Sequence, residues 1–341
     1  MLISQDPLLS VIIPVRNSVL SLGACLKSLN ASTYTNYEVL VVDDASTDVF
    51  SDLIFQEGVK WFRLSTQRGP AAARNHGAMA ARGRYLLFID ADVCVHSDTL
   101  TLVVDTLTNN PRLDAVFGSY DLHPRAGNFL SQYKNLLHHF VHQQSAEQAS
   151  TFWSGCGAIK RSVFLEFGGF DTSYGRPCIE DIELGIRLRK AGATVALRKD
   201  IQVMHLKCWT FWGLIKTDIW DRGIPWTQLI LRERMLPNDL NLTTSHRAST
   251  LLSYSLLVVL GFPFQSQWFL VSVLFLCIVM LNTRLYLFFA RERTMWFAVQ
   301  AVFMHIFYYL YSGAAFACGV VLHAWNALCS SQGCGRDSIR R

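Results

Sequence analysis

Short apolar runs alternate with helix-like segments through the first 90 residues of the chain. The runs are continuous, which is typical of strands that are buried on both faces of a sheet. They cover residues 10–15, 38–42, 59–64 and 85–89. Apolar residues at helical spacing predict a helix over residues 19–29, and an alanine-rich stretch predicts another over residues 70–81. This order predicts an α/β domain with a Rossmann-like, mostly parallel sheet and helices on both faces.

From about residue 113 to residue 201 the apolar pattern is less regular, and we expect shorter elements there. They are a helix near residues 129–142, a glycine-rich strand near 155–160, a helix over 180–191 that is capped by Gly192, and a strand over 194–197. Together with the regular first part, these elements place the α/β domain at residues 1–205.

After about residue 245 the chain becomes strongly apolar. Three apolar stretches cover residues 248–264, 268–281 with a continuation to 290, and 295–325. The first is about 25 Å long at ~1.5 Å per residue, slightly short of a ~30 Å hydrocarbon core. We therefore expect amphipathic interfacial helices at 206–247, a transmembrane region of two or three helices at 248–325, and a tail at 326–341.

Charged residues around the apolar stretches leave two membrane topologies open. Arginines within residues 284–293 place the loop before the third stretch on the cytoplasmic side by the positive-inside rule. With the α/β domain also cytoplasmic, the first two stretches form a hairpin and the third one crosses. The arginines of residues 336–341 instead favour a cytoplasmic tail. One stretch would then lie in the interface plane, leaving two crossings.

Composition narrows the classes of partner. Hydrophobic residues make up 51% of the 341 residues, and the formal net charge is +5. The positive net charge suits an acidic lipid or a phosphorylated substrate as a partner. No basic stripe is interleaved with aromatic residues, so nucleic acid is not an expected partner. The arginines before the apolar part suit anionic headgroups, although a solvated face explains each of them equally well. They are Arg222, Arg232, Arg234 and Arg247.

Nine cysteines are scattered along the chain without metal-like spacing. Their odd number argues against a complete disulfide framework. Cys25, Cys94 and Cys156 have apolar neighbours, as small buried residues in a reducing compartment do. The first residues lack the basic region and the long apolar region of a signal peptide. We therefore expect the α/β domain in the cytosol.

Two of the predicted strands end in acidic residues. Asp90 and Asp92 follow the strand at 85–89, and Asp43 and Asp44 end the strand at 38–42. Ligands of such sheets bind outside the carboxyl ends of the strands, so these acids fall in one crevice. Paired carboxylates there suit a hard cation that binds together with phosphates. A carboxylate can also accept hydrogen bonds from a base or a ribose hydroxyl.

Each acidic strand end also has a purely structural interpretation. Asp90 and Asp92 would then be solvated acids of a turn. In the other loop, Ser46 or Thr47 would cap a following helix, with Asp48 in its first turn.

Two further motifs open predicted helices. Small residues over 69–77 allow close helix packing beside a nucleotide site, from which Arg74 would reach a phosphate or an acid of a metal site. The alternative is an exposed helix arginine. Glu180 and Asp181 begin the helix at 180–191, where acids commonly complement the helix dipole. A carboxylate in a cleft can instead serve as a general base.

Taken together and in this order, these motifs resemble the family 2 glycosyltransferases of GT-A fold, here in a membrane-anchored, non-processive form. They are Pro14-Val15-Arg16-Asn17, the run from Asp43 to Asp48, Arg74-Asn75, Asp90-Ala91-Asp92, Gly168-Gly169-Phe170-Asp171 and Glu180-Asp181. The resemblance covers roughly residues 9–204 and implies that residues 1–205 form a GT-A catalytic domain. It implies a hexosyltransferase-type enzyme.

The resemblance also implies roles for individual residues. The residues that would contact the donor nucleotide are Pro14, Arg16, Asn17, Asp43, Asp44, Arg74 and Asp90. Asp92, with Asp90, would hold Mg²⁺ or Mn²⁺ against the diphosphate. Asp181 would be the catalytic base, with Glu180 as its neighbour. The family inverts the anomeric centre in a single displacement, and the cation offsets the charge that develops on the leaving diphosphate.

For several residues outside the acidic motifs, both a functional and a structural role remain open. In related GT-A enzymes a histidine placed like His205 contacts the metal or the diphosphate, whereas a lone histidine is more often structural. Trp209, Arg222 and Trp226 are candidate phosphate or acceptor contacts or interfacial anchors. Arg222 and Trp226 loosely resemble the Gln-x-x-Arg-Trp motif of processive synthases. Ile219 stands where the glutamine belongs, which favours a non-processive enzyme.

We therefore expect an integral membrane protein, as in a bacterial inner membrane, with a cytoplasmic catalytic domain. It would move a sugar from a nucleotide diphosphate sugar to a lipid or lipid-linked acceptor at the cytoplasmic face. One alternative is a soluble or surface-glycan acceptor. Another is a non-catalytic membrane partner, which the retained acids disfavour. A nucleotidyltransferase lacks support because no glycine-rich loop with a lysine follows the first strand.

Overall fold

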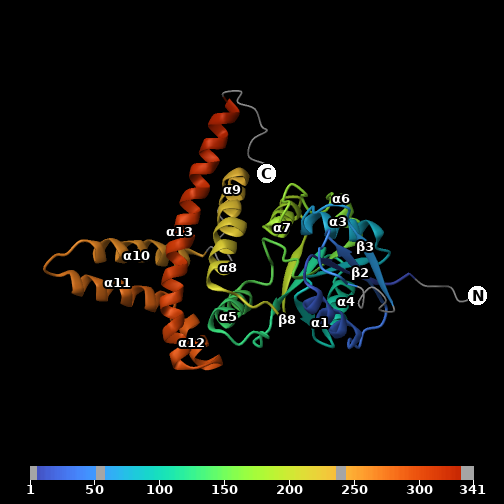
Figure 1. The fold of residues 1–341 in the computed structure, drawn as a ribbon, viewed down its shortest axis with the longest axis horizontal. Helices are drawn as coiled ribbons and strands as arrows, with labels where there is room; N and C mark the ends of the chain where they lie inside the picture. The colour runs from blue at the N-terminus through green and yellow to red at the C-terminus, as the bar shows by residue number, and fades with distance from the viewer. Residues whose placement is uncertain (1–5, 51–57, 236–242, 332–341) are drawn as a thin grey trace, which may run out of the picture. The chain divides into compact units, whose positions relative to one another are not determined.

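The computed structural model describes residues 6–50, 58–235 and 243–331. It divides into two compact units, Met1–Trp209 and Thr210–Arg341 (Figure 1). The arginines of the expected tail, at residues 336–341, lie outside the described residues.

The described part of the first unit is built on an eight-stranded sheet with the order β3-β2-β1-β4-β7-β6-β8-β5. The strands are β1 (Leu9–Val15), β2 (Tyr37–Asp43), β3 (Val59–Arg63), β4 (Tyr85–Ile89), β5 (Val93–Val95), β6 (Ala115–Tyr120), β7 (Cys156–Lys160) and β8 (Val195–His205). The helices are α1 (Val19–Asn30), α3 (Pro70–Ala80), α4 (Thr99–Asn109), α5 (Phe129–Gln144), α6 (Arg161–Glu166) and α7 (Glu180–Lys190). These elements confirm the predicted α/β fold.

The direction of the strands changes between the two halves of the sheet. β3, β2, β1 and β4 are parallel, as the order of elements predicts. β7 runs antiparallel to β4 and β6, and β5 runs antiparallel to β8, whereas β6 and β8 are parallel. The sheet is therefore mixed. An apolar run carries no direction, so the reversal of β7 was not predictable from the pattern.

Both faces of the sheet are buried, which explains the continuous apolar runs. Successive side chains of a strand point to opposite faces. Ile13 and Leu87 belong to the core cluster that includes α1 and α4. Ile12 and Phe88 belong to the cluster that includes α3, α6 and α7 (Figure 1). Each such side chain stabilises the fold by ~1.5–3 kcal/mol.

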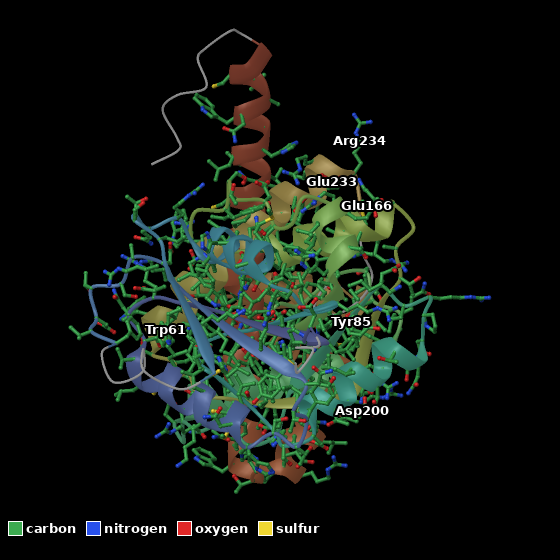
Figure 2. The ribbon with its side chains drawn as sticks, turned by 90° about the vertical axis from the view of Figure 1, so that its right-hand side faces the viewer. Trp61, Tyr85, Glu166, Asp200, Glu233 and Arg234 are labelled. Atoms are coloured by element: carbon green, nitrogen blue, oxygen red, sulfur yellow. The ribbon has the colours of Figure 1, made fainter. Side chains whose placement is uncertain are left out.

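The β3 edge of the sheet is less enclosed than its centre. Tyr85, at the start of β4, is 1% exposed, whereas Trp61 on the edge strand β3 is only partly buried (Figure 2). Tyr85 lies within the core because β4 has a neighbouring strand on each side.

Small residues bring α3 close to the sheet, as the sequence predicts. A Cβ atom at Gly77 would lie 2.6 Å from Cγ2 of Ile12 and 3.2 Å from Cγ2 of Val42. Ala71 and Ala78 are fully buried on the same helix. A larger side chain at Gly77 would push α3, and with it Arg74, away from β1.

The second unit is helical in its described part. It contains α8 (Phe211–Lys216), the π-helical segment η1 (Thr217–Gly223), α9 (Ile224–Glu233), α10 (Thr244–Gly261), α11 (Gln267–Leu281), α12 (Thr283–Glu292) and α13 (Met295–Ser331). Polar side chains link these helices internally. Asn282 donates through Nδ2 to Oγ of Ser249 (3.0 Å), and the Tyr309 hydroxyl donates to Oδ1 of Asn282 (2.8 Å).

Among the described residues, length and composition mark one helix as able to cross a membrane, Met295–Cys329, with a mean hydropathy of 1.4. α11 and α12 are apolar enough together, but they are bent by 68° at the break between them. They add a second candidate crossing only if the bent pair is one span. α10 is too polar over its 18 residues, because its first turns carry serine, threonine, histidine and arginine.

Candidate active site

The loops after β1, β2 and β4 meet at one edge of the sheet. Val15 and Asp43 are register partners at the ends of β1 and β2. The N–H of Asp44 donates to the carbonyl of Val15 (2.9 Å). β4 pairs with β1 in the same direction and ends at Ile89. The acid-bearing loops therefore share the crevice that parallel strands form at their carboxyl ends.

Arg74 of α3 links two acids that are distant in the sequence. Its Nη1 donates to Oε1 of Glu180 and its Nη2 to Oδ1 of Asp90, both at 2.7 Å. Its guanidinium also lies over the ring of Phe170, 5.5 Å from the centroid. Only 5% of the Arg74 side chain is exposed. Arg74 thus joins the first turn of α7 to the loop after β4.

A loop at residues 168–171 fixes α7 against α3. Asn75 accepts a hydrogen bond from the Phe170 N–H (2.9 Å) and donates one to its carbonyl (2.8 Å). Arg187 of α7 donates to the carbonyl of Gly169 (2.7 Å) and forms two 2.8 Å hydrogen bonds with Glu183. The two adjacent residues therefore have different partners. Arg74 binds two acids, and Asn75 binds the backbone of Phe170. The roles of Arg187 and Glu183 were not predicted.

Glu180 and Asp181 are adjacent but differ in environment. Glu180 is 4% exposed and accepts a second hydrogen bond from the N–H of Cys178 (3.0 Å). Asp181 is partly exposed, and its Oδ2 accepts from both the N–H and the hydroxyl of Ser154, each at 3.0 Å. Asp181 is thus the accessible acid of the two. Ser154 was not predicted, because no local motif marks it.

Asp92 faces His205 across a strand pair. β5 and β8 bring Val93 opposite His205, and the N–H of Leu206 donates to the carbonyl of Asp92 (2.8 Å). Nε2 of His205 lies 3.7 Å from Oδ2 of Asp92. The ring of Tyr120 stacks on His205 at 4.2 Å and 11°. The structure therefore brings together two of the predicted metal ligands.

The site holds more acids than cations. Burial raises the pKa of Asp90, and the charges of Asp92 and Asp181 raise it further against the opposing effect of Arg74. Burial likewise raises the pKa of Glu180. For Asp92, burial is outweighed by His205 and Lys207, which lower the pKa of its carboxyl. An added cation would stabilise such a cluster.

The donor set fits a divalent cation that is completed by other ligands. Within residues 6–50, 58–235 and 243–331, no group of three or more His, Cys, Asp and Glu side chains is arranged to hold a metal ion. Asp90 is turned to Arg74. Asp92 and His205 offer an oxygen and a nitrogen at 3.7 Å, near the ~3 Å that separates adjacent ligands of an octahedral ion. Magnesium is commonly bound through only one or two carboxylates together with phosphates and water, and Asp92 can supply one.

The loops after β1 and β2 are tied to each other. Asn17 has a positive φ of 48°. Its N–H donates to Oγ of Ser46 (2.9 Å), and its Oδ1 accepts from the N–H of Thr47 (2.8 Å). Pro14 is buried within β1, whereas Arg16 is exposed. Their contacts with a nucleotide stay predictions.

Asp43 and Asp44 have structural partners. Asp43 accepts a hydrogen bond from the N–H of Ser46 (2.9 Å). Asp44 accepts from the N–H groups of Arg68 (2.7 Å) and Gly69 (2.8 Å). Gly69 has a φ of +86°, which favours glycine, so Asp44 fixes the turn that starts α3. Ser46 and Thr47 do not cap a helix with Asp48 in its first turn, because residues 47–50 are not helical, so that expectation is wrong. Residues 51–57 lie outside the described residues.

The remaining candidates lie away from the acids in sequence and differ in exposure. Trp209 is 5% exposed in the first unit. In the second unit, Arg222 is half exposed at 3.9 Å from Asp218, and Trp226 is partly buried in α9. Contacts of these three side chains with phosphate or acceptor stay predictions.

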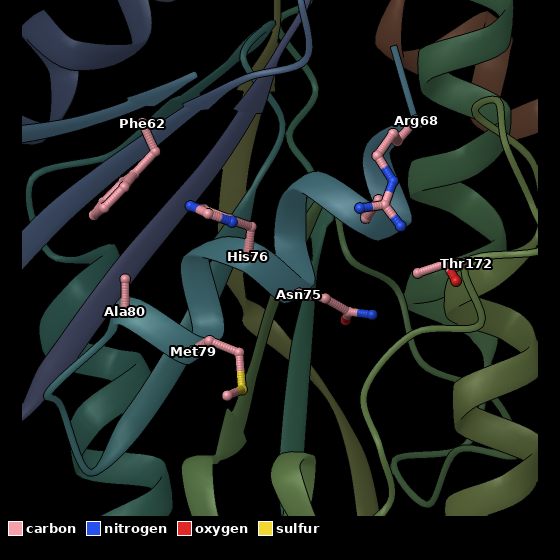
Figure 3. Close-up of a pocket in the computed structure, with 8 residues that line it drawn as sticks. Phe62, Arg68, Asn75, His76, Met79, Ala80 and Thr172 are labelled. Carbon is pink, nitrogen blue, oxygen red and sulfur yellow. The ribbon is translucent and has the colours of Figure 1, made fainter. Parts of the chain in front are cut away.

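A groove of about 530 Å³ runs along the outer side of α3. Figure 3 shows Asn75, His76 and Met79 along the helix, with Phe62 on one side and Thr172 on the other. None of the predicted acids lines it. The groove is therefore distinct from the acid cluster.

The sheet with helices on both faces, the Asp-x-Asp pair after β4 and the acid pair that opens α7 are the features on which the resemblance to GT-A enzymes rests. Residues 10–168 match the model of the family described as glycosyl transferase family 2. This part of the chain is therefore similar to the family 2 glycosyltransferases, which agrees with the resemblance seen in the motifs.

Similar proteins are also named as glycosyltransferases. An uncharacterized glycosyltransferase of Haemophilus influenzae is 28% identical over 188 residues, which are 53% of this chain and 62% of that protein. The Escherichia coli protein WfgD, named as a UDP-Glc:alpha-D-GlcNAc-diphosphoundecaprenol beta-1,3-glucosyltransferase, is 31% identical over 121 residues, 35% of this chain and 47% of that protein. The chain thus spans less than two thirds of the length of these relatives.

A solved structure shares the fold. The mannosyltransferase PcManGT from Pyrobaculum calidifontis, described in complex with GDP-Man and Mn²⁺, is similar with a TM-score of 0.55. The match covers 89% of this chain and 88% of that chain at 18% sequence identity. This likeness shows a GT-A fold.

Proposed function

We propose that this protein is an inverting glycosyltransferase that moves a sugar from a nucleotide diphosphate donor to an acceptor hydroxyl. The observation that carries the proposal is the Arg74 bridge between Asp90 and Glu180. Asp92 and Asp181, which lie beside these acids in the sequence, are thereby held at the same end of the sheet. Metal and base chemistry then share one site.

Asp92 and His205 are the residues that would hold a divalent cation, Mg²⁺ or Mn²⁺, with the donor diphosphate. Such an ion, when bound, offsets the charge that develops on the leaving diphosphate. The excess of acids around Arg74 supports this assignment, as does the presence of GDP-Man and Mn²⁺ with the structurally similar mannosyltransferase. Asp90 would act through Arg74 or contact the donor ribose.

Asp181 would act as the general base. Its carboxylate is partly exposed and oriented by Ser154, so it can accept the proton of an acceptor hydroxyl. The acceptor oxygen forms a bond to the anomeric carbon while the bond to the diphosphate breaks, and the electron pair leaves with the diphosphate. Attack from the face opposite the diphosphate inverts the anomeric centre. Glu180 would hold Arg74 and thereby position Asp181.

The acceptor would be a lipid or a lipid-linked sugar at the cytoplasmic face of a membrane. The apolar helix Met295–Cys329 supports membrane attachment. The name of the similar E. coli protein, which specifies a diphosphoundecaprenol acceptor, supports a lipid-linked substrate. In this proposal residues 1–205 are catalytic, 206–247 are interfacial and 248–325 are membrane-embedded. A soluble or surface glycan is the alternative acceptor.

Donor binding can be tested by thermal unfolding of the full chain in detergent with UDP or GDP, with and without Mn²⁺. A ligand that binds the folded state at 100 times its Kd adds about 2.7 kcal/mol of stability. We expect one of the two nucleotides to raise the Tm only with Mn²⁺, and Asp92→Asn to remove the shift. If neither nucleotide binds with Mn²⁺, the donor assignment is wrong.

The acceptor class can be tested with membranes that contain the protein and a radiolabelled nucleotide sugar. Extraction with organic solvent separates lipid-linked from soluble products. We expect the label in the organic phase with the wild-type chain and in neither product with Asp181→Asn. Enzyme-dependent label in an aqueous glycan would instead establish the alternative acceptor.

A further inference from the structure

The segment that follows β8 is anchored on both sides. The N–H of Leu206 donates to the carbonyl of Asp92 (2.8 Å). At Trp209, the N–H donates to Oγ of Ser131 (2.7 Å) and the carbonyl accepts from Nδ2 of Asn128 (2.8 Å). Lys207 lies between these anchors, so its backbone is held in place relative to Asp92.

The side chain of Lys207 is held over an aromatic ring. Its Nζ lies 4.1 Å from the ring centroid of Trp209, which is itself only 5% exposed. A cation–π contact at an exposed site stabilises by ~0.5–1 kcal/mol and restricts a flexible side chain. The buried indole thus acts as a platform for the exposed lysine.

The charge of Lys207 acts on the proposed metal site. After burial and His205, Lys207 is among the groups that set the pKa of Asp92, and it favours the ionised carboxylate. This agrees with the geometry, since Lys207 directly follows Leu206, whose N–H is bonded to the carbonyl of Asp92. Arg74 is less suited to bind that diphosphate, because Asp90 and Glu180 already engage its buried guanidinium.

We propose that Lys207 binds a phosphate oxygen of the donor diphosphate and that Trp209 positions it for this contact. The inference rests on the proposed function, since it requires a nucleotide diphosphate at Asp92. A lysine ammonium binds phosphate as a point charge. The contact strengthens as the leaving diphosphate gains charge, so Lys207 contributes to turnover as well as to binding.

The test compares UDP or GDP, whichever the wild-type chain binds with Mn²⁺, with the corresponding nucleoside, using the full chain in detergent. Lys207→Met keeps the apolar stem and removes the charge. We expect it to weaken binding of the nucleoside diphosphate ~10–100-fold, the range of a charged hydrogen bond, and to leave binding of the nucleoside unchanged. Lys207→Arg should restore most of the affinity for the diphosphate.

Two further variants make the test specific. Lys27→Met removes the same charge from the exposed end of α1, which runs back to the opposite end of the sheet, and should bind as wild type. Trp209→Phe keeps an aromatic platform and should lose less affinity than Trp209→Leu. Wild-type affinity for the diphosphate in Lys207→Met, with binding still lost in Asp92→Asn, overturns the role of Lys207 alone. Absence of binding in the wild-type chain overturns the proposed function and this inference together.

Discussion

Arg74 carries one positive charge, yet it lies among several carboxylates. It pairs with Asp90 and Glu180, and Asp181 also acts on it. A buried ion pair contributes little net stability, but removing one partner leaves an uncompensated charge. At the scale of the residue, Arg74 is therefore structurally necessary even if it never contacts the donor.

Arg74→Met should lower the free energy of unfolding by about 3–5 kcal/mol at neutral pH, because it leaves the buried carboxylate of Glu180 and the partly exposed one of Asp90 without their cation. Raised pKa values mean that ionisation of these acids opposes folding. This free-energy cost of ionisation is full above the folded-state pKa values of Asp90 and Glu180. It disappears as the pH falls below their unfolded-state pKa values of 3.8 and 4.5. Denaturant unfolding at pH 7.5 and pH 4 should show the difference shrinking.

The matched control is Arg198→Met, which removes an arginine from an exposed pair with Asp200. Exposed pairs contribute ~0–1 kcal/mol, so this variant should unfold almost as wild type. Equal losses in the two variants would refute the assignment of Arg74 as a buried bridge.

Asp181→Asn should abolish sugar transfer and leave donor binding intact. Asparagine keeps an oxygen that accepts from Ser154 but cannot take a proton, and loss of a general base lowers the rate ~10²–10⁴-fold. Initial rates with labelled donor and the thermal shift with nucleotide and Mn²⁺ measure the two properties. Turnover near the wild-type rate would assign the base elsewhere.

At the scale of the elements, one buried carboxylate ties three strands together. Glu38 of β2 accepts hydrogen bonds from Ser10 of β1, from Lys60 of β3 and from the N–H of Arg82, each at 2.7 Å. Arg82 lies in the turn before β4. This cluster involves the first residues of the strands, whereas the acids of the active site follow their last residues.

Glu38→Gln should lower the free energy of unfolding by ~1–2 kcal/mol above about pH 5. Burial raises the pKa of Glu38, but its hydrogen bonds and Lys60 outweigh burial and hold the pKa below 4.5. The ionised group therefore stabilises the fold above the unfolded value of 4.5, and this contribution is lost as the pH falls through the lower folded value. Thermal unfolding of both chains from pH 3 to 7 checks this. A gap that widens toward low pH would contradict it.

At the scale of the whole molecule, large apolar side chains are exposed on the helices of the second unit. Trp268 and Phe269 of α11 and Trp296 and Phe303 of α13 are each more than 60% exposed. Exposed apolar surface on this scale is unusual for a protein in water and typical of a surface that faces a membrane or binds another protein. A lipid environment would account for these side chains.

If α13 crosses a membrane, the effect of a charge on it should depend on depth. Phe316, near the middle of the helix, is 50% exposed, and Trp296, near its start, is 68% exposed. Phe316→Lys should disfavour insertion by ~2.5–3.5 kcal/mol, whereas the lysine of Trp296→Lys can reach the interface. Alkaline extraction of membranes should release more of the Phe316 variant. Equal behaviour of the two variants would argue against a membrane-spanning α13.

The sequence by itself determined most of the elements of the first unit. Continuous apolar runs predicted β1, β2, β3 and β4 within one or two residues, and α3 and α7 begin at the predicted residues. These features can be predicted because a strand that is buried on both faces of a sheet is a continuous apolar run in the sequence. Acids that follow such a run mark the end of the strand. The strand predicted at 194–197 is wrong in length, because β8 extends to His205, and β5 and β6 were not predicted. The motifs were sufficient to indicate a similarity to the family 2 glycosyltransferases, whose family model matches residues 10–168. The roles of the individual site residues stay predictions.

Tertiary structure alone decided which of these groups meet. Pairing of β5 with β8 brings His205 to Asp92, and Arg74 selects Asp90 and Glu180 as its partners. No local pattern encodes such a partner, because each contact joins segments that many residues separate. A carboxylate or a guanidinium finds its partner only after distant elements have packed, and the charge and geometry of the site are set at that step.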